Sequence, residues 1–376
     1  MFHSSQNNAR GCFLFYHDIQ VAKKPDGVMN KVRAQLSAFD MAGIPCDLIN
    51  CKSPETFFTK GFSSLPLVSD LIHWPDPRLL SEYTFVYIRR PAFISKELIK
   101  FMSGARKQNP TLKILLELPT YPYDHEMSTP LLYAALIKDR LNRNKLRLYV
   151  DRIVTMSPDS SIFGTTTIPI INGVDLSGIA PKQAARSLDT INIVSAALFQ
   201  PWHGIDRLIE GLARFYADSS HDRNIILHLA GDGGAIRSLK RHVRRLHLSE
   251  HVLFHGYCDH NQLNELYDEC SLAVECLGLS RKSLFISSSL KSREYLAKGI
   301  PFLCANEIDV FIDNPVDFCM VAPNDETPID IERLVNFHDR LYNVDSQSNL
   351  ISRIRSYAES HVGIDRTMTN VINYVS

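Results

Sequence analysis

The sequence lacks several features that would indicate particular classes of protein. It has no excess charge of either sign, because 41 basic and 41 acidic residues give a formal net charge of zero. General nucleic-acid binders usually carry a clear basic excess, so this balance argues against a nucleic-acid partner. No apolar run reaches the roughly 18 residues needed to span a membrane, and no basic region, long apolar segment and cleavage site open the chain. These absences predict a cytoplasmic protein.

Cysteine is present, but not in a pattern that indicates a metal centre. None of the cysteines forms a C-x-x-C pair, and most lie in apolar runs typical of strands. Such residues are usually small core residues of a protein in a reducing compartment. The sequence therefore predicts no disulfide, no metal ion and no other cofactor. The cysteines are Cys12, Cys46, Cys51, Cys258, Cys270, Cys276, Cys304 and Cys319.

What the sequence does have is a regular alternation of short apolar runs and longer helical patterns. This alternation is typical of β-α-β units around a parallel sheet, so the predicted fold class is α/β. The strands expected in the first half are Cys12–Ile19, Cys46–Cys51, Tyr83–Arg89, Leu112–Leu118, Asp151–Met156 and Ile168–Ile171. Those expected in the second half are Ile191–Leu198, Ile225–Ala230, Val252–His255, Leu272–Cys276, Pro301–Cys304 and Cys319–Val321.

A polar segment without periodicity, Leu176–Thr190, interrupts the alternation and predicts a hinge. At roughly 100–200 residues per domain, 376 residues also favour two domains. We therefore predict an N-terminal domain of residues 1–174 and a C-terminal domain of residues 175–359. A last helix, at about 360–376, is expected to pack back on the first domain. In open α/β sheets ligands bind at the carboxyl ends of the strands, so the loops there are where chemistry is expected.

The loop after the expected strand Leu272–Cys276 carries the richest set of polar side chains. Three serines lead into a helix that ends at Gly299. Serine hydroxyls and helix N–H groups can hold an anion, basic side chains add positive charge, and a carboxylate one turn into the helix can bind sugar hydroxyls. The alternative is a flexible loop and a solvated, charged helix face. The residues concerned are Ser287, Ser288, Ser289, Arg281, Lys282, Lys291, Arg293 and Glu294.

Two other loops of the second half are candidates. In FQPWHG, Trp202 could stack on a ligand ring and His203 could donate to a phosphate or act as an acid or base. The alternative is that Trp202 is a core residue beside the hinge and His203 a surface residue. In LAGDGG, Gly233 lies in a tight turn that resembles a dinucleotide-binding loop, but Ile236 stands where that motif needs glycine. A nicotinamide cofactor is therefore disfavoured.

The first half offers two weaker candidates. Gly27 opens the first expected helix and would allow a ligand close to the backbone, although it is also a common turn residue. The loop LELPTYPYDHE brings aromatic rings beside carboxylates, which suits sugar binding, and its acidic and imidazole groups could serve as a base. A rigid surface loop is the alternative. The residues concerned are Tyr121, Tyr123, Asp124, His125 and Glu126.

The segment Lys138–Arg152 contains six basic and two acidic residues. A basic amphipathic segment can lie on an anionic membrane surface, which here would be peripheral contact with the inner membrane. A solvated helix face is the commoner alternative.

The order of the motifs resembles the C-terminal half of glycosyltransferases of the two-Rossmann (GT-B) fold, and more narrowly the large retaining family of bacterial polysaccharide and lipid-sugar transferases. In the first half, the segment 26–49 resembles the glycine loop and first helix of that family, and LELPTYPYD resembles capsular and exopolysaccharide enzymes. The motifs are IINGVDL (170–176), SAALFQPWHGIDRLIEGL (195–212), LHLAGDGG (227–234), HVLFHGYCDHNQLNELYDECSLAVECL (251–277) and SSLKSREYLAKGIPFLCA (288–305).

The resemblance implies two Rossmann-like parallel-sheet domains that face each other across a cleft. It implies transfer of a hexosyl group from a nucleotide-diphosphate sugar to a carbohydrate or lipid-linked acceptor, in polysaccharide or glycoconjugate biosynthesis, with retention and without a metal. Cations and helix N–H groups would stabilise the leaving diphosphate. The implied roles are diphosphate stabilisation by Lys291, Arg281 and the amides of Ser287–Ser289 with help from His203, ribose binding by Glu294, close approach at Gly27, and acceptor binding near Tyr121–Glu126.

The sequence departs from the family pattern at two places. The first carboxylate of the Glu-x7-Glu motif falls on Ile286, and His203-Gly204 stands where the family usually has Lys-Gly. Because of these departures, a non-catalytic partner subunit is an alternative. A nucleotide-sugar 2-epimerase, which shares the fold, is another. A dehydrogenase is a more distant alternative because of the poor glycine pattern.

Overall fold

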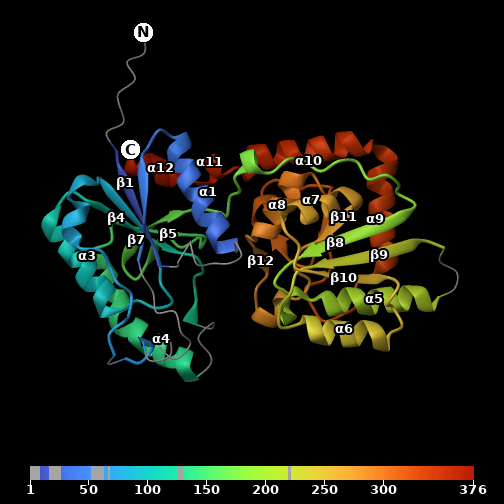
Figure 1. Cartoon of the computed structure of the whole chain (residues 1–376), viewed down its shortest axis with the longest axis horizontal. Coiled ribbons are helices and arrows are strands. Elements are labelled where there is room, and N and C mark those ends of the chain that lie inside the picture. The colour runs from blue at the N-terminus through green and yellow to red at the C-terminus, as the bar shows by residue number, and fades with distance from the viewer. Residues whose placement is uncertain (1–8, 17–26, 52–62, 67, 125–129, 219–221) are drawn as a thin grey trace, which may run out of the picture. The chain divides into compact units, whose positions relative to one another are not determined.

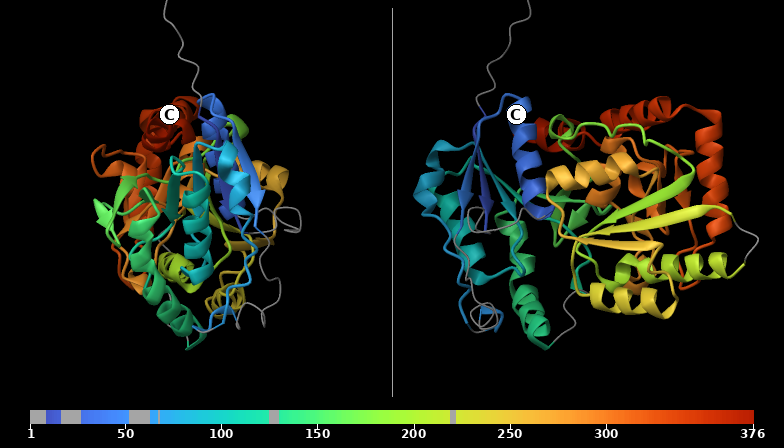
Figure 2. Two further views of the ribbon diagram at one scale, coloured as in Figure 1. Left: turned by 90° about the vertical axis from the view of Figure 1, so that its left-hand side faces the viewer. Right: turned by 45° about the vertical axis from the view of Figure 1, so that its right-hand side comes forward.

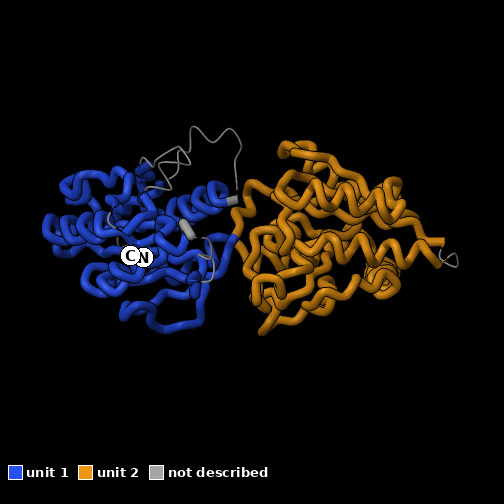
Figure 3. The backbone as a smooth tube through the Cα atoms, turned by 90° about the horizontal axis from the view of Figure 1, so that it is seen from below, with its two compact units in different colours: residues 1–173, 364–376 blue, residues 174–363 orange. Residues whose placement is uncertain are grey.

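The computed structural model describes residues 9–16, 27–51, 63–66, 68–124, 130–218 and 222–376. The chain forms two compact units, shown in blue and orange in Figure 3. Unit 1 comprises residues 1–173 and 364–376, and unit 2 comprises residues 174–363. The sequence placed the boundary at 174/175 and expected the last helix, from about 360, to return to the first domain. In the structure the chain returns to unit 1 at residue 364.

The chain crosses between the units at two adjacent points. Just inside unit 2, Val174 pairs with Gly363 in an isolated parallel bridge, and the N–H of Val174 donates to the carbonyl of Val362 at 2.9 Å. The first and last segments of unit 2 therefore run side by side, and unit 2 is an insertion within unit 1.

Unit 1 is built on a seven-stranded sheet with the order β2-β1-β3-β4-β5-β7-β6, in which every pair except β6–β7 is parallel (Figure 1). Strands β1, β3 and β4 are almost fully buried, which explains their continuous apolar runs, because parallel strands are covered on both faces. The strands are β1 (Gly11–Phe15), β2 (Cys46–Asn50), β3 (Phe85–Arg89), β4 (Lys113–Leu118), β5 (Arg152–Thr155), β6 (Ser161–Ile162) and β7 (Thr165–Pro169).

Helices cover both faces of this sheet (Figure 2). One of the helical layers includes the C-terminal segment, whose Met368, Val371 and Val375 are buried in the same hydrophobic cluster as Phe13 and Phe39. Residues from the first strand and helix and from the C-terminal segment thus share one hydrophobic core. The helices are α1 (Gly27–Met41), α3 (Lys96–Gln108), α4 (Pro130–Asn142), α11 (Ile364–Thr367) and α12 (Thr369–Val375), with short 3-10 helices η1 (Pro77–Glu82) and η3 (Arg143–Leu148).

Unit 2 contains a six-stranded, wholly parallel sheet with the order β10-β9-β8-β11-β13-β15. The strand order reverses between β8 and β11, which is the topological switch point where open α/β sheets bind ligands. Two parallel-sheet units confirm the predicted α/β fold class. The strands are β8 (Thr190–Ala196), β9 (Asn224–Ala230), β10 (Val252–Gly256), β11 (Leu272–Val274), β13 (Phe302–Cys304) and β15 (Cys319–Val321), and β12 (Ile286–Ser287) pairs with β14 (Glu307–Ile308).

The helices of unit 2 follow the predicted pattern in part. In α6 (Ile236–Arg245), Leu239 and Val243 are buried and form the inner stripe expected from their spacing. Two long helices near the end of the unit, α9 and α10, were not predicted. The other bounds are α5 (Ile205–Ala217), α7 (His260–Glu269), α8 (Leu290–Lys298), α9 (Ile331–Val344), α10 (Gln347–His361), and 3-10 helices η5 (Pro201–His203) and η6 (Leu279–Lys282).

All eight cysteines are free thiols, and those at 12, 51, 270, 276 and 304 are buried. Among the described helices, none combines the length and apolar character needed to cross a membrane.

Candidate functional site

The two loops that flank the switch point of unit 2 carry most of the predicted site residues. Because β8 and β11 are parallel neighbours, the loops that follow them leave the sheet at the same edge. The first contains η5 with Trp202 and His203, and the second contains η6 and leads to α8. The fold therefore brings together His203, Arg281, Lys282 and Lys291, which are as much as 88 positions apart in the sequence.

These two loops are packed backbone against backbone. Gly204 has a φ of +66°, and a side chain there would place its Cβ 2.5 Å from the backbone nitrogen of Gly278. The N–H of Leu277 also donates to the carbonyl of His203 at 2.9 Å. Glycine is thus required at position 204 for two reasons, since it permits the left-handed conformation and the close approach. The contact fixes His203 beside the β11 loop.

His203 is held as a neutral imidazole. Its Nδ1 accepts a hydrogen bond from the backbone N–H of Gln200 at 2.9 Å, which assigns the ring proton to Nε2. Burial, reinforced by the charges of Lys291 and Lys282, lowers the pKa of His203 to about 3. A neutral ring with Nε2–H is a hydrogen-bond donor at physiological pH. The geometry therefore favours the predicted donation to a phosphate over a role as acid or base.

Lys291 lies in the first turn of α8, and its Nζ donates to the backbone carbonyl of Glu275 at 3.1 Å. It has no carboxylate partner among the ion pairs of the described residues. Nζ also forms a hydrogen bond with the thiol of Cys276, and an ammonium group has three donors, so further donor capacity is left. Lys291 is therefore suited to bind an anion.

Glu275, immediately after β11, was not singled out from the sequence. Its side chain is fully buried, and its Oε2 accepts a hydrogen bond from the N–H of Cys276. Oε1 has no partner in the part of the chain that the structure describes. Buried polar atoms of this kind are rare and mark strained or functional positions. The sequence signal was an acidic residue at the end of the apolar run LAVE.

Lys282 and Trp202 contact each other directly. The Nζ of Lys282 lies 4.7 Å from the centroid of the Trp202 ring, within the range of a cation–π interaction. A ligand ring that stacked on Trp202 would compete with this contact. Both residues nevertheless stay at the predicted edge of the sheet.

Arg281 is placed differently from the two lysines. Its Nη2 lies 2.8 Å from Oδ2 of Asp206 and 2.5 Å from Oε2 of Glu326. The two carboxylates neutralise the guanidinium and raise its pKa. Arg281 therefore joins η6 to α5, and its predicted catalytic role would require it to leave these partners.

The serines before α8 form the expected helix start. Ser289 is the N-cap, and its hydroxyl accepts from the N–H of Ser292 at 3.1 Å. Ser288 accepts from Nη2 of Arg293 at 3.1 Å, and Ser287 is buried in β12. The helix ends at Gly299, which has a φ of +75°, as predicted.

The positive charge expected from Arg293 is neutralised within the fold. Arg293 is fully buried and its Nη2 pairs with Oδ1 of Asp309. It stabilises the packing of α8 and does not present its charge at the edge of the sheet.

Glu294 follows on the same helix and accepts a hydrogen bond at Oε1 from the hydroxyl of Tyr267, at 3.1 Å. Burial raises the pKa of its carboxyl group, partly offset by this hydrogen bond. Its side chain is partly exposed, so it can reach a ligand hydroxyl. The predicted binding of a ribose stays a prediction.

The glycines of the β9 loop have a structural reason. Gly233 has a φ of +136°, and a Cβ at this position would lie 2.3 Å from the carbonyl oxygen of Phe199. This turn must therefore pass directly over the β8 loop. The motif that resembles a dinucleotide-binding loop is explained by this crossing, whether or not Gly233 also contacts a donor.

In unit 1, the carboxyl edge of the sheet holds a buried network around Glu117, which the sequence analysis missed. Lys31 Nζ lies 2.7 Å and Arg89 Nη1 lies 2.8 Å from Glu117 Oε1. Tyr87 and Gln35 donate to Oε2 at 2.9 and 3.0 Å. Burial alone would raise the pKa of Glu117, but the two cations outweigh it and lower the pKa to about 2. The signal in the sequence was a charged residue at or near the end of two apolar runs, Arg89 after FVYI and Glu117 after ILL.

The predicted acceptor-side loop is partly accounted for by the fold. Tyr123 is buried and donates to Asp139 Oδ2 at 2.9 Å. Asp124 pairs with Arg140 and Arg143 at 2.7 and 2.6 Å. Tyr121 is half-buried. Gly27 begins α1, whereas His125 and Glu126 lie outside the described residues.

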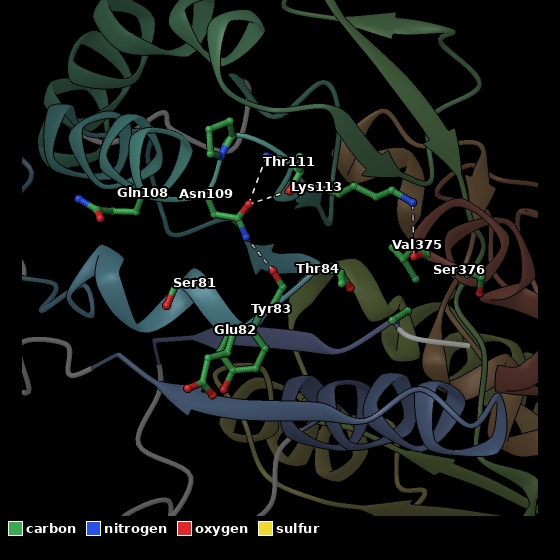
Figure 4. Close-up of a pocket in the computed structure, with 12 residues that line it drawn as sticks. Ser81, Glu82, Tyr83, Thr84, Gln108, Asn109, Thr111, Lys113, Val375 and Ser376 are labelled. Carbon is green, nitrogen blue, oxygen red and sulfur yellow. Dashed lines mark hydrogen bonds between the residues drawn. The ribbon is translucent and has the colours of Figure 1, made fainter. Parts of the chain in front are cut away.

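A shallow pocket of about 620 Å³ in unit 1 lies at the opposite edge, where β3 and β4 begin (Figure 4). Its polar groups bond to one another: Asn109 Nδ2 donates to the carbonyl of Tyr83 at 3.0 Å, and Lys113 Nζ donates to the carbonyl of Tyr374 at 2.7 Å. These contacts seal α12 against the sheet. The pocket is therefore explained by chain packing and not by the chemistry of the loops.

Comparison with known proteins finds one sequence family that part of unit 2 resembles. Residues 179–307, about a third of the chain and all within unit 2, match the family described as glycosyl transferases group 1. This stretch includes the loops with His203 and Lys291. No curated protein matches the sequence.

Solved structures share the fold across nearly the whole chain. Sucrose-phosphate synthase from Thermosynechococcus elongatus has 16% identity and a TM-score of 0.63, covering 98% of this chain and 99% of that one. HepE from Anabaena, in complex with UDP, has 14% identity and a TM-score of 0.62, with 97% and 100% covered. The lipopolysaccharide outer core galactosyltransferase WaaB has 14% identity and a TM-score of 0.55, with 97% and 99% covered. At these identities the likeness shows the fold alone.

Proposed function

We propose that this protein is a glycosyltransferase that moves a hexosyl group from a nucleotide-diphosphate sugar to a glycan or lipid-linked acceptor. The observation that carries the proposal is the position of Lys291 and His203, which face the same loop edge at the switch point of a unit that matches group 1 glycosyl transferases. Two nitrogen donors at this edge, one charged and one neutral, suit a diphosphate. The reaction belongs to the biosynthesis of polysaccharides or glycoconjugates in the cytoplasm.

The proposed chemistry follows from the charge that develops when the sugar–diphosphate bond breaks. Lys291 and Lys282 supply positive charge, and His203 Nε2–H adds a neutral donor, so that protein groups stabilise the leaving group. We propose that no metal is needed, and undiminished turnover after chelation of divalent ions tests this. Retention at the anomeric carbon, which the family resemblance favours, is tested by the NMR coupling constant of the product.

Glu294 is proposed to bind the ribose of the donor, since its partly exposed carboxylate lies one turn into α8 after the N-cap serine. The acceptor is proposed to bind at the carboxyl edge of unit 1, near Tyr121. HepE, which shares the fold, has been crystallised with UDP and with UDP-glucose. Uridine diphosphate sugars are therefore the first donors to test.

A second candidate is a non-catalytic partner subunit of the same fold. Two observations favour it: Ile286 occupies the place of the first motif carboxylate with 52% of its surface exposed, and Arg281 is neutralised by Asp206 and Glu326. Such a subunit would bind a nucleotide sugar without turning it over. A 2-epimerase would instead convert the donor without any acceptor.

The proposal is tested by thermal shift of the purified chain against sugars of UDP, GDP, ADP, dTDP and CDP, with NAD and NADP as controls. A ligand that binds the folded state raises its melting temperature. We expect one class of nucleotide sugar to stabilise the protein, and Lys291→Ala or Glu294→Ala to abolish the shift. A shift with NAD or NADP alone, or with nothing, would refute it. Binding without sugar release or transfer would favour the partner subunit.

A further inference from the structure

Helix α4 of unit 1 (Pro130–Asn142) buries Ala135 and Leu136, as a surface helix normally does, but it also exposes large apolar side chains on its outer face. Its buried face contains two charged residues, Lys138 with 2% and Asp139 with 0% of the surface exposed. Its outer face contains Tyr133, Ile137 and Leu141, which are 55%, 40% and 63% exposed. Surface helices normally bury their apolar residues and expose their charges. The outer face of α4 therefore calls for an explanation other than stability in water.

The buried charges fix the helix in this orientation. Lys138 Nζ donates to the carbonyl oxygens of Ser63 and Val68 at 2.8 and 2.7 Å. Asp139 accepts from the N–H of Ile94 at 2.8 Å and from the Tyr123 hydroxyl at 2.9 Å. Rotating α4 to bury its outer side would break all four hydrogen bonds and would expose Ala135 and Leu136. The apolar side is thus held outward by the fold.

The exposed apolar residues form one continuous line, here called the α4 outer stripe. Tyr133, Ile137 and Leu141 are spaced by four residues, so they lie above one another on the same helix face. Leu148, at the end of the following η3, is a further exposed apolar residue, with 62% of its surface exposed. Large apolar side chains exposed in an ordered series, and not singly, mark an interaction surface.

Charge distinguishes the kinds of partner that this stripe could take. Between residues 130 and 148 the sequence contains one acidic residue, Asp139, and it is fully buried. Arg140, Lys145 and Arg147 are exposed beside the stripe. Of these, Arg140 pairs with Asp124, and Lys145 bonds to the side-chain oxygen of Asn142 at 3.2 Å. The combination of exposed apolar residues with cations and no exposed acid matches an anionic lipid surface.

This surface differs from the one that the basic segment Lys138–Arg152 indicated. Lys138 is buried, and the Arg152 guanidinium lies over the ring of Tyr374 at 4.7 Å. Neither contributes to the exposed basic set. The basic surface that the structure defines is therefore one face of α4 and η3, and not the whole basic segment of the sequence.

We propose that the α4 outer stripe, with Lys145 and Arg147, is the membrane-docking surface of unit 1 and takes an anionic lipid bilayer. The apolar side chains enter the region between headgroups and acyl chains, and the long basic side chains reach phosphate groups. This deepens the proposed function and rests on it where it concerns a lipid-linked acceptor. In unit 1, α4 lies at the end opposite α12 (Figure 1), and Asp139 bonds to the segment that follows β3. The stripe therefore lies near the edge that carries the predicted acceptor loop.

The test is co-sedimentation of the full chain with vesicles of equal parts phosphatidylglycerol and phosphatidylcholine, compared with pure phosphatidylcholine. We expect binding to the anionic vesicles that weakens with salt. Leu141→Glu should lower the partition coefficient about tenfold or more, because it removes an inserted apolar group and adds a negative charge. Lys145→Gln and Arg147→Gln should each lower it roughly fivefold.

Leu79→Glu is the matched control, because Leu79 is 59% exposed in η1 of the same unit and undergoes the same chemical change. It should bind vesicles as the wild type does. Equal binding by wild type and Leu141→Glu, or an equal loss in Leu79→Glu, overturns the proposal. Light scattering without vesicles tests a third outcome. If the wild type is a dimer and Leu141→Glu dissociates it, a second copy of the chain covers the stripe, and the proposal is refuted.

The vesicle assay needs neither donor nor acceptor, so its result does not depend on whether the proposed transferase activity exists. Leu141→Glu should retain the thermal shift with nucleotide sugars, which depends on unit 2. Vesicle binding without any nucleotide-sugar shift would leave the docking surface standing and refute the transferase.

Discussion

The two units place charged side chains at the same edge of similar sheets, but they treat these charges in opposite ways. In unit 1, Glu117 is buried and receives four donors, two of them from Lys31 and Arg89. In unit 2, Lys291 contacts a backbone carbonyl, and Lys282 lies over Trp202. A satisfied network stabilises its own fold, whereas cations without carboxylate partners are available to a ligand. The comparison supports placing the proposed donor site in unit 2, where Lys291 and Lys282 have no carboxylate partners among the described residues, and assigning the network of unit 1 to stability.

The largest expected effect tests the claim that the network of unit 1 is structural. Glu117→Ala leaves Lys31 and Arg89 buried without a counter-charge, and loss of one partner of a buried pair typically costs about 3–5 kcal/mol. The free energy of unfolding from urea titration should fall by that order. Glu326→Gln, which removes a mostly exposed carboxylate in unit 2, serves as the control and should cost under about 1 kcal/mol. Similar costs in the two variants would remove the contrast between the units.

The next effect concerns ligand affinity and not stability. Lys291→Ala removes a charged donor from the proposed diphosphate site, where a charge-assisted hydrogen bond contributes about 1.5–3 kcal/mol. Donor affinity measured by calorimetry should fall about tenfold to a hundredfold, with the melting temperature of the unliganded protein unchanged. Lys240→Ala, on the exposed face of α6, is the control. A melting temperature lowered as much as in Glu117→Ala would show that Lys291 is structural too.

Acid should weaken unit 2 before unit 1. The folded pKa of His203 is lowered to about 3 and that of His228 to about 4, mainly by burial. The unfolded chain therefore binds more protons, so stability is complete above the unfolded value of about 6.5 and is lost as the pH falls through that range toward the folded values. Each histidine contributes less than about 1.4 kcal/mol per pH unit, because solvent partly screens both.

Glu117 of unit 1 loses its contribution to stability at a lower pH than the two histidines do. Its folded pKa of about 2 lies below the ordinary value, so its contribution is retained until the pH falls below about 4.5 and is then lost. Urea titrations at pH 7 and pH 5 should show a loss that His203→Asn reduces and Glu117→Gln does not. If His203→Asn leaves the loss between pH 7 and pH 5 undiminished, the assignment to His203 is wrong.

The smallest effect separates Arg281 from Lys291. Arg281 is 23% exposed and forms ion pairs with two surface carboxylates, so Arg281→Gln should cost about 0.5–1 kcal/mol of stability. If the pairs are only structural, turnover should remain within about twofold of wild type once the protein is folded. A clear drop in kcat would instead support the catalytic role that the family resemblance predicts for Arg281.

Much of the fold could be predicted because parallel strands are buried on both faces. The runs CFLF, FVYI and ILL are apolar along their whole length, so strand positions follow from composition alone. The start and stop of α8 were also predictable, since Ser289 and Gly299 are typical caps.

The pairing of charges could not be predicted, because it depends on tertiary neighbours. Arg281 stood among basic residues in the sequence, yet its partners Asp206 and Glu326 lie 75 and 45 positions away. The orientation of α4 was hidden for a related reason. Helical periodicity shows that Tyr133, Ile137 and Leu141 share a face, but it assumes that an apolar face is the buried one.

The insertion of unit 2 within unit 1 sets the order in which the protein can fold as it is synthesised. Unit 2 is complete once residue 363 has been added, and its first and last segments already lie side by side. Unit 1 lacks Val371 and Val375 of its core until these residues have left the ribosome. The half of the chain that is translated first must therefore finish folding last. A message cut short between codons 363 and 371 would release a finished unit 2 joined to an open unit 1.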